Sequence, residues 1–442
     1  MIKDREMGFK PVKVGICGLG TVGSGTFNVL QRNQEEISRR AGRVIRVEQI
    51  GARRPNPLAD TNGVQMTTDL FEVVRNPEID IVVELIGGCD VARELVLEAI
   101  ANGKHVVTAN KALIAEHGNE IFEAAVNKHV MVAFEASVAG GIPIVKAIRE
   151  GLAANSINWV AGIINGTGNF ILTEMRDKGR AFDDVLAEAQ ALGYAEADPT
   201  FDVEGIDAAH KLTILSSLAF GVPLQFSKAY TEGISKITAE DVNYAEELGY
   251  RIKHLGITRR TPSGIELRVH PTLIPAKRLI ANVDGVMNAV LVDADAVGPT
   301  LYYGAGAGAE PTASAVIADL VDVVRTLTSD RDNRVPHLAF HPSSLSDLQM
   351  LPMEEVETAY YLRMRAEDHP GVLADITRIL AEQEISIDAI VQRKTDDPLV
   401  PIILLTHVVK EARMNEAIRA IEALEAISGE VTRIRVETLD GK

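Results

Sequence analysis

The sequence predicts an α/β protein with three successive parts: a doubly wound parallel sheet, a mixed α+β part and a small βαββαβ part. Three observations carry this prediction. The chain has 442 residues, which is too long for one ordinary hydrophobic core. Short apolar runs alternate with amphipathic stretches as far as about residue 135, and the last part of the chain follows its own order of strand and helix patterns.

The first domain is expected at residues 1–138. Its strand-like runs are short and apolar, with helical patterns between them, and they lie at residues 11–18, 44–52, 79–87, 104–109 and 129–136. This βαβ rhythm is typical of a Rossmann-like, doubly wound parallel sheet.

Residues 139–335 are expected to form a mixed α+β domain for substrate binding, catalysis and dimerisation. Longer helices alternate here with strands such as residues 264–274 and 285–294, and the last helix can return to the first domain. A linker follows at residues 336–357, in a proline-containing stretch without sustained periodicity.

The third domain is expected at residues 358–442. Its order is strand, helix, strand, strand, helix and strand, at residues 360–367, 371–383, 385–394, 400–409, 414–427 and 430–438. Such an order buries one face of a four-stranded sheet under two helices.

Composition excludes several classes of function. The formal net charge is −17 and no stretch is rich in Lys and Arg, so we expect neither nucleic acid nor a membrane surface as a partner. The apolar run near the N-terminus is too short and too rich in glycine for a signal peptide or a membrane span. Two cysteines among 442 residues fit a reducing cytoplasm.

A glycine motif follows the first strand. Gly18, Gly20 and Gly23 have the spacing GxGxxG, with Thr21 and Val22 between them, and a helical stretch begins there. The first glycine permits a tight turn, the second lets a pyrophosphate approach the backbone, and the third permits close helix packing. The motif predicts a dinucleotide site, against the alternative of a plain turn.

The second strand ends at Arg53 and Arg54, where a strictly NAD-binding domain has an acidic residue against the ribose 2′-hydroxyl. Guanidinium groups can hold a 2′-phosphate instead, so we expect NADP, with NAD possible. The alternative is an exposed basic loop.

Asp207 and Lys211 have helical spacing with Ile214, Leu215 and Leu218, so we expect them on the apolar face of one helix. An exposed Asp–Lys pair contributes only about 0.3–0.5 kcal/mol. A buried lysine beside a carboxylate can instead reach a pKa that suits proton transfer. We favour a catalytic pair over an exposed salt bridge.

Two further features are expected near this pair. Lys111 follows a strand at the carboxyl edge of the sheet, where it meets cofactor or substrate, or else is a surface lysine. Glu196, Asp198 and Asp202 lie in a loop of small residues and suit the ammonium group of an amino-acid substrate. A metal site there is the alternative, but the loop has no His or Cys at ligand spacing.

Three glycine-rich turns have two interpretations each. The turn at residues 135–143 can present carbonyls to a monovalent cation or simply join two domains. The amides of Gly166 and Thr167 can hold a substrate carboxylate or cap a helix. Gly306 and Gly308 precede a helix in another anion site or flexible turn.

The chain resembles the homoserine dehydrogenase family. The resemblance runs from about residue 11 to 335 and rests on GLGTVG, TANKALIA, EASVAGGIP, GIINGTGNFIL, GYAEADPTFDVEGIDAAHKLTIL and GAGAGAEPTASAV. The segment from residue 193 to 211 is the most specific part. The remainder of the chain, with residues 368–374 after its first strand, resembles an ACT domain, as in the threonine-regulated form of that family.

The resemblance implies reversible oxidation of L-homoserine to L-aspartate 4-semialdehyde, in threonine, methionine and isoleucine biosynthesis, with threonine as inhibitor and a homodimer or homotetramer as the assembly. It implies that Lys211 exchanges the proton at the substrate oxygen, that Lys111 lies beside it at the cofactor, and that Asp207 and Glu196 hold substrate. It also implies that carbonyls around four residues bind Na⁺ or K⁺: Glu135, Val138, Gly140 and Ile142.

Two rival functions are weighed against this one. A phosphorylating semialdehyde dehydrogenase would use Cys89, which lies near the expected nicotinamide side, as a thiolate. Cys17 is expected to be a small core residue. A non-enzymatic regulator that senses cofactor and amino acid is the second rival, but it has no use for a lysine on an apolar face.

Overall fold

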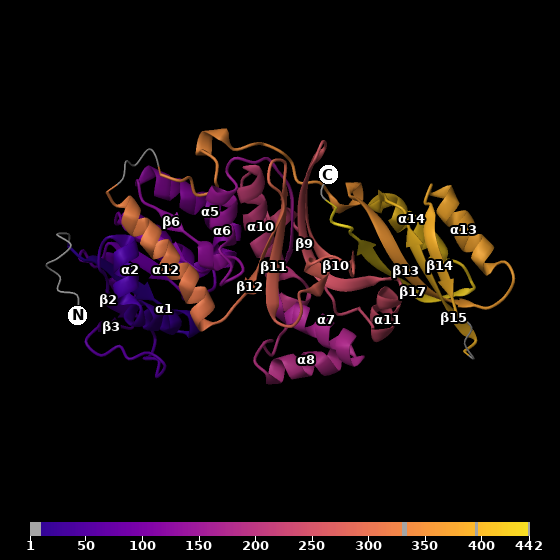
Figure 1. Ribbon diagram of the computed structural model, residues 1–442, viewed down its shortest axis with the longest axis horizontal. Coiled ribbons are helices and arrows are strands. Elements are labelled where there is room, and N and C mark those ends of the chain that lie inside the picture. Colours follow the sequence, from indigo (N-terminus) through magenta and orange to yellow (C-terminus); the bar gives the residue numbers. More distant parts are fainter. Residues whose placement is uncertain (1–9, 329–333, 394–396, 441–442) are drawn as a thin grey trace. The chain divides into compact units, whose positions relative to one another are not determined.

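The computed structural model describes residues 10–328, 334–393 and 397–440 (Figure 1). The first nine residues, where we expected no signal peptide, lie outside the described residues. The chain forms two compact units: residues 1–166, 207–227 and 286–348 make the first, and residues 167–206, 228–285 and 349–442 make the second. Within the described ranges, no helix combines the length and apolar character needed to cross a membrane.

The first unit contains the predicted parallel sheet. Its strand order is β3-β2-β1-β4-β5-β6, and every neighbouring pair is parallel, over β1 Val12–Cys17, β2 Ile45–Gly51, β3 Gln65–Thr67, β4 Ile81–Glu84, β5 His105–Thr108 and β6 Val132–Ala133. The expected doubly wound parallel sheet is therefore confirmed. The short edge strand β3 was not anticipated, because three residues carry no periodic pattern.

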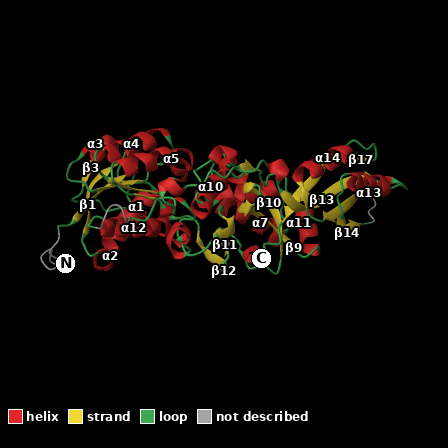
Figure 2. Cartoon of the chain, turned by 90° about the horizontal axis from the view of Figure 1, so that it is seen from above, coloured by secondary structure: helices red, strands yellow, loops and turns green. Residues whose placement is uncertain are grey.

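Helices cover both faces of this sheet (Figure 2). One set consists of α3 Leu70–Arg75, α4 Asp90–Ala101 and α5 Lys111–Asn127, and the other of α1 Thr21–Arg32, α2 Gln34–Ala41 and α12 Ala309–Thr326. The late helix α12 packs on α1 in the same hydrophobic core. Their approach is so close that a Cβ on Gly25 would lie 2.5 Å from the carbonyl oxygen of Ala309.

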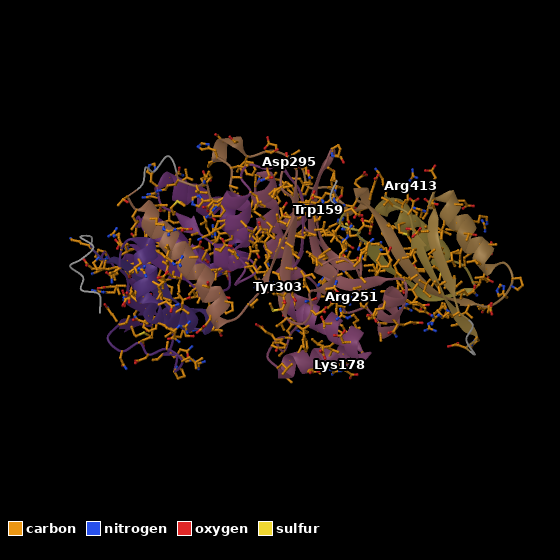
Figure 3. The ribbon with its side chains drawn as sticks, viewed as in Figure 1. Trp159, Lys178, Arg251, Asp295, Tyr303 and Arg413 are labelled. Carbon is orange, nitrogen blue, oxygen red and sulfur yellow. The ribbon has the colours of Figure 1, made fainter. Side chains whose placement is uncertain are left out.

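The rest of the first unit holds β7 Ile157–Ile163, β11 Met287–Ala294 and β12 Gly298–Ala305, which pair antiparallel in the order β7-β11-β12. Trp159 on β7 is buried, whereas Tyr303 on the edge strand β12 is 59% exposed (Figure 3). The short elements η1 Glu135–Ser137, α6 Ile144–Lys146, the π-helix η2 Ala147–Gly151 and η6 Pro342–Ser344 complete it.

Helix α10, Ile206–Phe220, differs from its prediction. We expected a single apolar face, but every residue from Asp207 to Phe220 is buried. The other faces carry residues such as Ala209, Leu212 and Ser216, which are apolar or small, and a helix of this composition can be buried all round. The predicted stripe was wrong in extent, although it placed Asp207 and Lys211 correctly out of water.

In the second unit, α7 Gly166–Lys178, α8 Phe182–Ala191, α9 Thr200–Val203 and α11 Ala239–Glu247 accompany the hairpin of β9 Tyr250–Thr261 and β10 Gly264–Pro275. The remaining small elements of this unit are β8 Tyr230–Thr231, η4 Ile280–Asn282 and η7 Met353–Glu355, while η3 Phe226–Lys228 begins in the first unit and ends in the second.

The C-terminal βαββαβ order is confirmed. It consists of β13 Glu357–Glu367, α13 Val372–Glu382, β14 Ile387–Gln392, β15 Leu399–Thr406, α14 Glu411–Glu422 and β17 Ile427–Val436, with the two-residue strand β16 Val409–Lys410 pairing with β13. The sheet order is β17-β13-β15-β14. Both helices pack on one face, in a core with Tyr360, Leu362 and Leu404. The other face packs in a separate core through Tyr361, Ile403 and other residues.

Candidate active site

Three charged side chains of the first unit meet at one carboxylate. Asp207 Oδ2 lies 2.7 Å from the Nζ atom of Lys211, one helical turn along α10, and Asp207 Oδ1 lies 2.8 Å from the Nζ atom of Lys111. Asp207 is 3% exposed and Lys211 8%, so the alternative of a solvated surface pair is wrong. The structure therefore brings the three predicted catalytic residues together.

The loop after β7 completes this cluster. Asn165 donates through Nδ2 to Asp207 Oδ2 at 2.8 Å, and the carbonyl oxygen of Ile164 accepts from Lys211 Nζ at 2.7 Å. The sequence analysis treated Asn165 only as part of a helix-capping loop. Its contact with Asp207 was not foreseeable, because nothing in the sequence shows that this loop faces α10.

The opposite charges of Asp207 and the two lysines stabilise one another. Burial would raise the pKa of the Asp207 carboxyl, but the charges of Lys211 and Lys111 hold it well below its usual value. Asp207 is thus a stable anion that accepts hydrogen bonds from two lysines and one amide. Such a carboxylate fixes the position of both ammonium groups and leaves their nitrogen atoms as the groups that can exchange protons.

Lys111 is held by the start of its helix. The side chain of Asn110 caps α5 by accepting from Leu113 N at 3.1 Å, and it donates to the carbonyl oxygen of Gly88 at 2.6 Å. Lys111 is therefore the first residue of α5 and lies just beyond the carboxyl end of β5. Ligands of open α/β sheets bind along this edge.

A buried glutamate organises the neighbouring strand end. Glu84 closes β4, is fully buried, and accepts from the hydroxyl of Thr108 at 2.6 Å and from the amide of Ile86 at 2.9 Å. Burial raises the pKa of its carboxyl, against these hydrogen bonds. Glu84 was missed by the sequence analysis, although a carboxylate at the end of an apolar strand is a signal that could have identified it.

The glycine motif has the geometry expected of a dinucleotide site. Gly18 has φ of 104°, and a Cβ on it would lie 2.5 Å from the carbonyl oxygen of Leu85. A Cβ on Gly23 would lie 2.1 Å from the Gly18 carbonyl oxygen. Apart from its two chain neighbours, no part of the described chain lies within 4 Å of a Cβ on Gly20, which leaves its backbone accessible to a ligand.

A cavity of about 1250 Å³ opens beside this motif. Gly18 and Gly20 line it on one side, and Arg53 and Arg54 line it on another. Both arginines are exposed. The cavity is large enough for a nucleotide, and its basic wall lies at the end of the second strand.

The turn after β6 contains the expected cation-binding carbonyls of Glu135, Val138, Gly140 and Ile142, whose residues are all buried. Ala139 and Gly140 both have positive φ, 52° and 44°, so the backbone turns sharply there. Among the residues that the structure describes, no backbone N–H donates to the carbonyl of Val138 or Gly140. Buried carbonyls of this kind need a partner, and a hard cation with oxygen ligands fits them.

The Glu135 side chain is enclosed as well. Its carboxylate accepts from the amides of Val145 and Lys146 at 2.9 and 2.8 Å, while its own amide donates to Asp319 at 2.7 Å. Burial and the nearby Asp319 raise the pKa of Glu135 to about 7. Burial also raises the pKa of Asp319, to about 6.

The loop before α12 packs against this turn. A Cβ on Gly140 would lie 2.6 Å from the carbonyl oxygen of Gly306, and a Cβ on Gly306 would lie 2.1 Å from Cγ of Asn288. Gly308, with φ of 120°, is the N-cap of α12. Asn288 was missed by the sequence analysis. Asn288 is 1% exposed, and its side chain leaves no room for a Cβ at position 306.

The expected substrate-binding residues are divided between the units. Gly166 belongs to the first, and a Cβ on it would lie 2.7 Å from the Val286 carbonyl oxygen. Thr167, Glu196 and Asp202 belong to the second. There the Thr167 hydroxyl donates to the Tyr194 carbonyl at 2.7 Å, and Glu196 is exposed. Their substrate contacts stay predictions.

The surroundings of Cys89 do not lower the pKa of its thiol. It is half-buried, and burial, followed by the charges of Glu116, Asp90 and Glu84, raises the pKa of its thiol. Cys17 is fully buried in β1, as expected of a core residue. A glycine-lined nucleotide cavity and a buried lysine–carboxylate cluster without a thiolate define a dinucleotide-dependent oxidoreductase.

Comparison with known sequences gives the particular family. The family described as "Homoserine dehydrogenase, NAD binding domain" matches residues 18–135, "Homoserine dehydrogenase" matches residues 143–321, and the ACT domain family matches residues 360–426. A homoserine dehydrogenase of Pseudomonas aeruginosa is 73% identical over 433 residues, with 98% of this chain and 100% of the relative covered. The chain belongs to the homoserine dehydrogenase family and is an oxidoreductase.

Solved structures agree. A homoserine dehydrogenase from Thiobacillus denitrificans is 70% identical, with a TM-score of 0.94 and coverage of 98% of this chain and 99% of that chain. A hyperthermophilic archaeal homoserine dehydrogenase in complex with NADPH is 26% identical, with a TM-score of 0.60 over 71% of this chain and 98% of that chain. Neither the thiolate enzyme nor the non-enzymatic regulator is consistent with this membership.

Proposed function

We propose that this enzyme interconverts L-homoserine and L-aspartate 4-semialdehyde with NADP as its main cofactor, within threonine, methionine and isoleucine biosynthesis. The observation that carries the proposal is the buried Asp207 carboxylate shared by Lys211 and Lys111. When bound, the nicotinamide supplies hydride transfer at the carbon that carries the substrate oxygen. The protein must then supply a group that exchanges the hydroxyl proton.

Lys211 is that group in our proposal. Its ammonium gives a proton to the carbonyl oxygen during reduction, and its neutral amine takes the hydroxyl proton during oxidation. Asp207 and Asn165 keep the Lys211 side chain in one position, which lowers the entropic cost of reaching the reactive geometry. Lys111 lies on the other Asp207 oxygen and faces the cofactor side.

Substrate recognition uses the remaining predicted residues. The carboxylates of Glu196 and Asp202 hold the substrate ammonium group, and the amides of Gly166 and Thr167 hold its carboxylate. Charge-assisted hydrogen bonds of these two kinds are complementary to an amino acid and to no neutral alcohol. The exposure of the Glu196 side chain supports this assignment.

The cofactor preference rests on Arg53. Its position in the wall of the cavity, after the second strand, supports contact with a 2′-phosphate. The NADPH complex of the archaeal homoserine dehydrogenase is consistent with this preference.

In the same proposal Gly306 and Gly308 approach the cofactor. The carbonyls of the turn at residues 135–142 hold Na⁺ or K⁺, and the bound cation stiffens the turn against this glycine loop.

Regulation and assembly complete the proposal. The ACT domain supports inhibition by threonine at the turn of Gly371. This turn follows the first strand of that domain, and Gly371 has φ of 106°. The exposed edge strand β12, with Tyr303, supports self-association as a homodimer or homotetramer. Two free cysteines, Cys17 and Cys89, support a cytoplasmic location.

Two substitutions of Lys211 test the reaction. K211A should lower kcat by about 10²–10⁴-fold, the range of a lost acid–base group, with little change in the Kd of NADPH. K211R keeps the ion pair with Asp207, but a guanidinium does not release its proton, so it should be equally slow in a folded protein. Lys128, exposed at the end of α5, is the matched control as K128A. Near-normal turnover of K211A or K211R would refute the proposal.

A further inference from the structure

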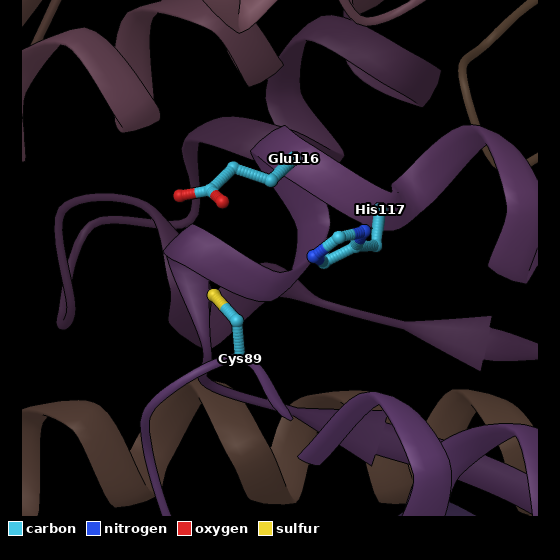
Figure 4. A group of neighbouring side chains, drawn as sticks. All are labelled: Cys89, Glu116 and His117. Carbon is cyan, nitrogen blue, oxygen red and sulfur yellow. The ribbon is translucent and has the colours of Figure 1, made fainter. Parts of the chain in front are cut away.

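A second cluster of reactive side chains lies outside the proton-transfer cluster. It consists of Cys89, at the start of α4, and Glu116 and His117, both on α5 (Figure 4). The Cys89 sulfur, one imidazole nitrogen of His117 and one carboxylate oxygen of Glu116 all lie within 4.8 Å of one another. Nothing in the proposed reaction uses any of them.

The backbone positions of this cluster are fixed by contacts on both sides. Asn110 donates to the Gly88 carbonyl at 2.6 Å and so ties the start of α5 to the residue before Cys89. One turn further along both helices, Arg93 and Glu120 form two hydrogen bonds of 2.7 Å. The helices are thus held in register, and the three side chains converge without any rearrangement of the backbone.

The environment favours a cation. After burial, the negative charges of Glu116, Asp90 and Glu84 raise the pKa of the Cys89 thiol. Acidic neighbours that oppose a bare thiolate attract a metal ion, and the metal ion in turn stabilises the thiolate. The same negative field therefore makes this position poor for a nucleophile and good for a metal.

Glu116 has the kind of outer partner that metal ligands have. Its Oε1 atom lies 3.0 Å from Nε2 of His210, and the His210 ring is stacked on Phe226. Hydrogen bonds of this type orient a ligating carboxylate. His210 thus holds the same carboxylate that lies beside the Cys89 sulfur and the His117 imidazole.

We propose that Cys89, Glu116 and His117 form a binding site for one thiophilic divalent cation of the Zn²⁺ type. A thiolate, an imidazole and a carboxylate are ligands that Zn²⁺ accepts, and with three protein ligands a water molecule completes the tetrahedron. Binding breaks the S–H bond of Cys89, releases that proton to solvent and forms the S–metal bond, with no change of oxidation state. The site links α4 to α5 directly beside Gly87, which lines the nucleotide cavity.

Cobalt gives a test with a specific spectrum. The full-length protein, reduced and freed of metal by a chelator, is titrated with Co²⁺. We expect one equivalent to bind with a thiolate-to-cobalt absorption band in the near ultraviolet and the visible bands of tetrahedral cobalt, and Zn²⁺ should remove both. Because cobalt and zinc share this geometry, the competition reports the zinc affinity.

Substitutions identify the ligands. C89S should abolish the thiolate band, and H117A should weaken Co²⁺ binding by at least about tenfold, since even outer partners of a metal ligand change affinity by about 10–100-fold. The matched control is C17S, because Cys17 is the other cysteine and is fully buried in β1. Absence of the thiolate band, or its persistence in C89S, would overturn the proposal. Turnover of the metal-free variants checks folding and separates this result from the test of Lys211.

Discussion

The Nζ atom of Lys111 lies 2.8 Å from Oδ1 of Asp207, on the opposite carboxylate oxygen from Lys211. Lys111 begins α5, at the carboxyl edge of the parallel sheet, whereas Asp207 lies in the first turn of α10. This one ion pair connects the edge where a dinucleotide binds to the helix that carries Lys211, the proton-exchanging group of our proposal. A single carboxylate, that of Asp207, thereby fixes the position of one lysine at the cofactor edge and of another on α10.

The contributions of the second and third glycines of the motif can be separated by G20A and G23A. A Cβ on Gly20 would meet no atom of the described residues within 4 Å beyond its chain neighbours, and φ there is −75°, so G20A should keep the Tm and raise the KM for the cofactor. A Cβ on Gly23 would lie 2.1 Å from the Gly18 carbonyl oxygen, so G23A should lower the Tm. Thermal unfolding and steady-state kinetics measure both. A large decrease in the Tm of G20A would contradict the interpretation that the space beside Gly20 is open to the cofactor.

The role of Arg53 predicts a cofactor-selective effect. R53A should raise the KM for NADP by about 10–100-fold, because a hydrogen bond to a charged group contributes about 1.5–3 kcal/mol, and should leave the KM for NAD nearly unchanged. R39A is the control, since Arg39 is an exposed arginine on α2 whose salt bridge is local. Equal effects on the two cofactors would show that Arg53 does not contact the 2′-phosphate.

Glu135 predicts a pH dependence of stability. Its pKa is raised from an ordinary 4.5 to about 7, so between these values the unfolded chain has lost a proton that the folded chain keeps, and stability falls as pH rises. In E135Q the side chain at this position does not titrate, so this decrease in stability with rising pH is absent. The gain in unfolding free energy of E135Q over wild type should therefore be larger at pH 8 than at pH 5, by up to about 3 kcal/mol.

Urea unfolding at the two pH values measures this difference, with E123Q as the control because Glu123 is exposed on α5. Asp319, whose pKa is also raised, is present in both proteins. A gain that is the same at both pH values would mean that Glu135 is ionised throughout.

The ACT-domain turn can be tested by G371A. Gly371 has φ of 106°, so alanine strains this turn at a cost of about 1–2 kcal/mol, and threonine should inhibit G371A less strongly while turnover without threonine is kept. G429A is the matched control, since Gly429 has φ of 79° in the same domain but lies in β17. Unchanged threonine inhibition in G371A, or equal loss in G429A, would place the effector elsewhere.

Features that depend on residues close together in the sequence were predictable from the sequence alone. The alternation of apolar runs located every strand of the parallel sheet except β3, and the C-terminal βαββαβ order was found element by element. The spacing of Gly18, Gly20 and Gly23 identified a turn whose sterics the structure reproduces, and the four-residue spacing of Asp207 and Lys211 put both on one turn of a helix.

Contacts between distant segments were not predictable. The ion pair of Lys111 with Asp207, the hydrogen bond from Asn165 and the packing of Asn288 against Gly306 each join elements that periodicity treats separately. The burial of α10 on every face likewise came from its surroundings. Local sterics and side-chain periodicity are encoded over a few residues, whereas such contacts depend on how whole helices and strands pack, and that packing is a collective property of the folded chain.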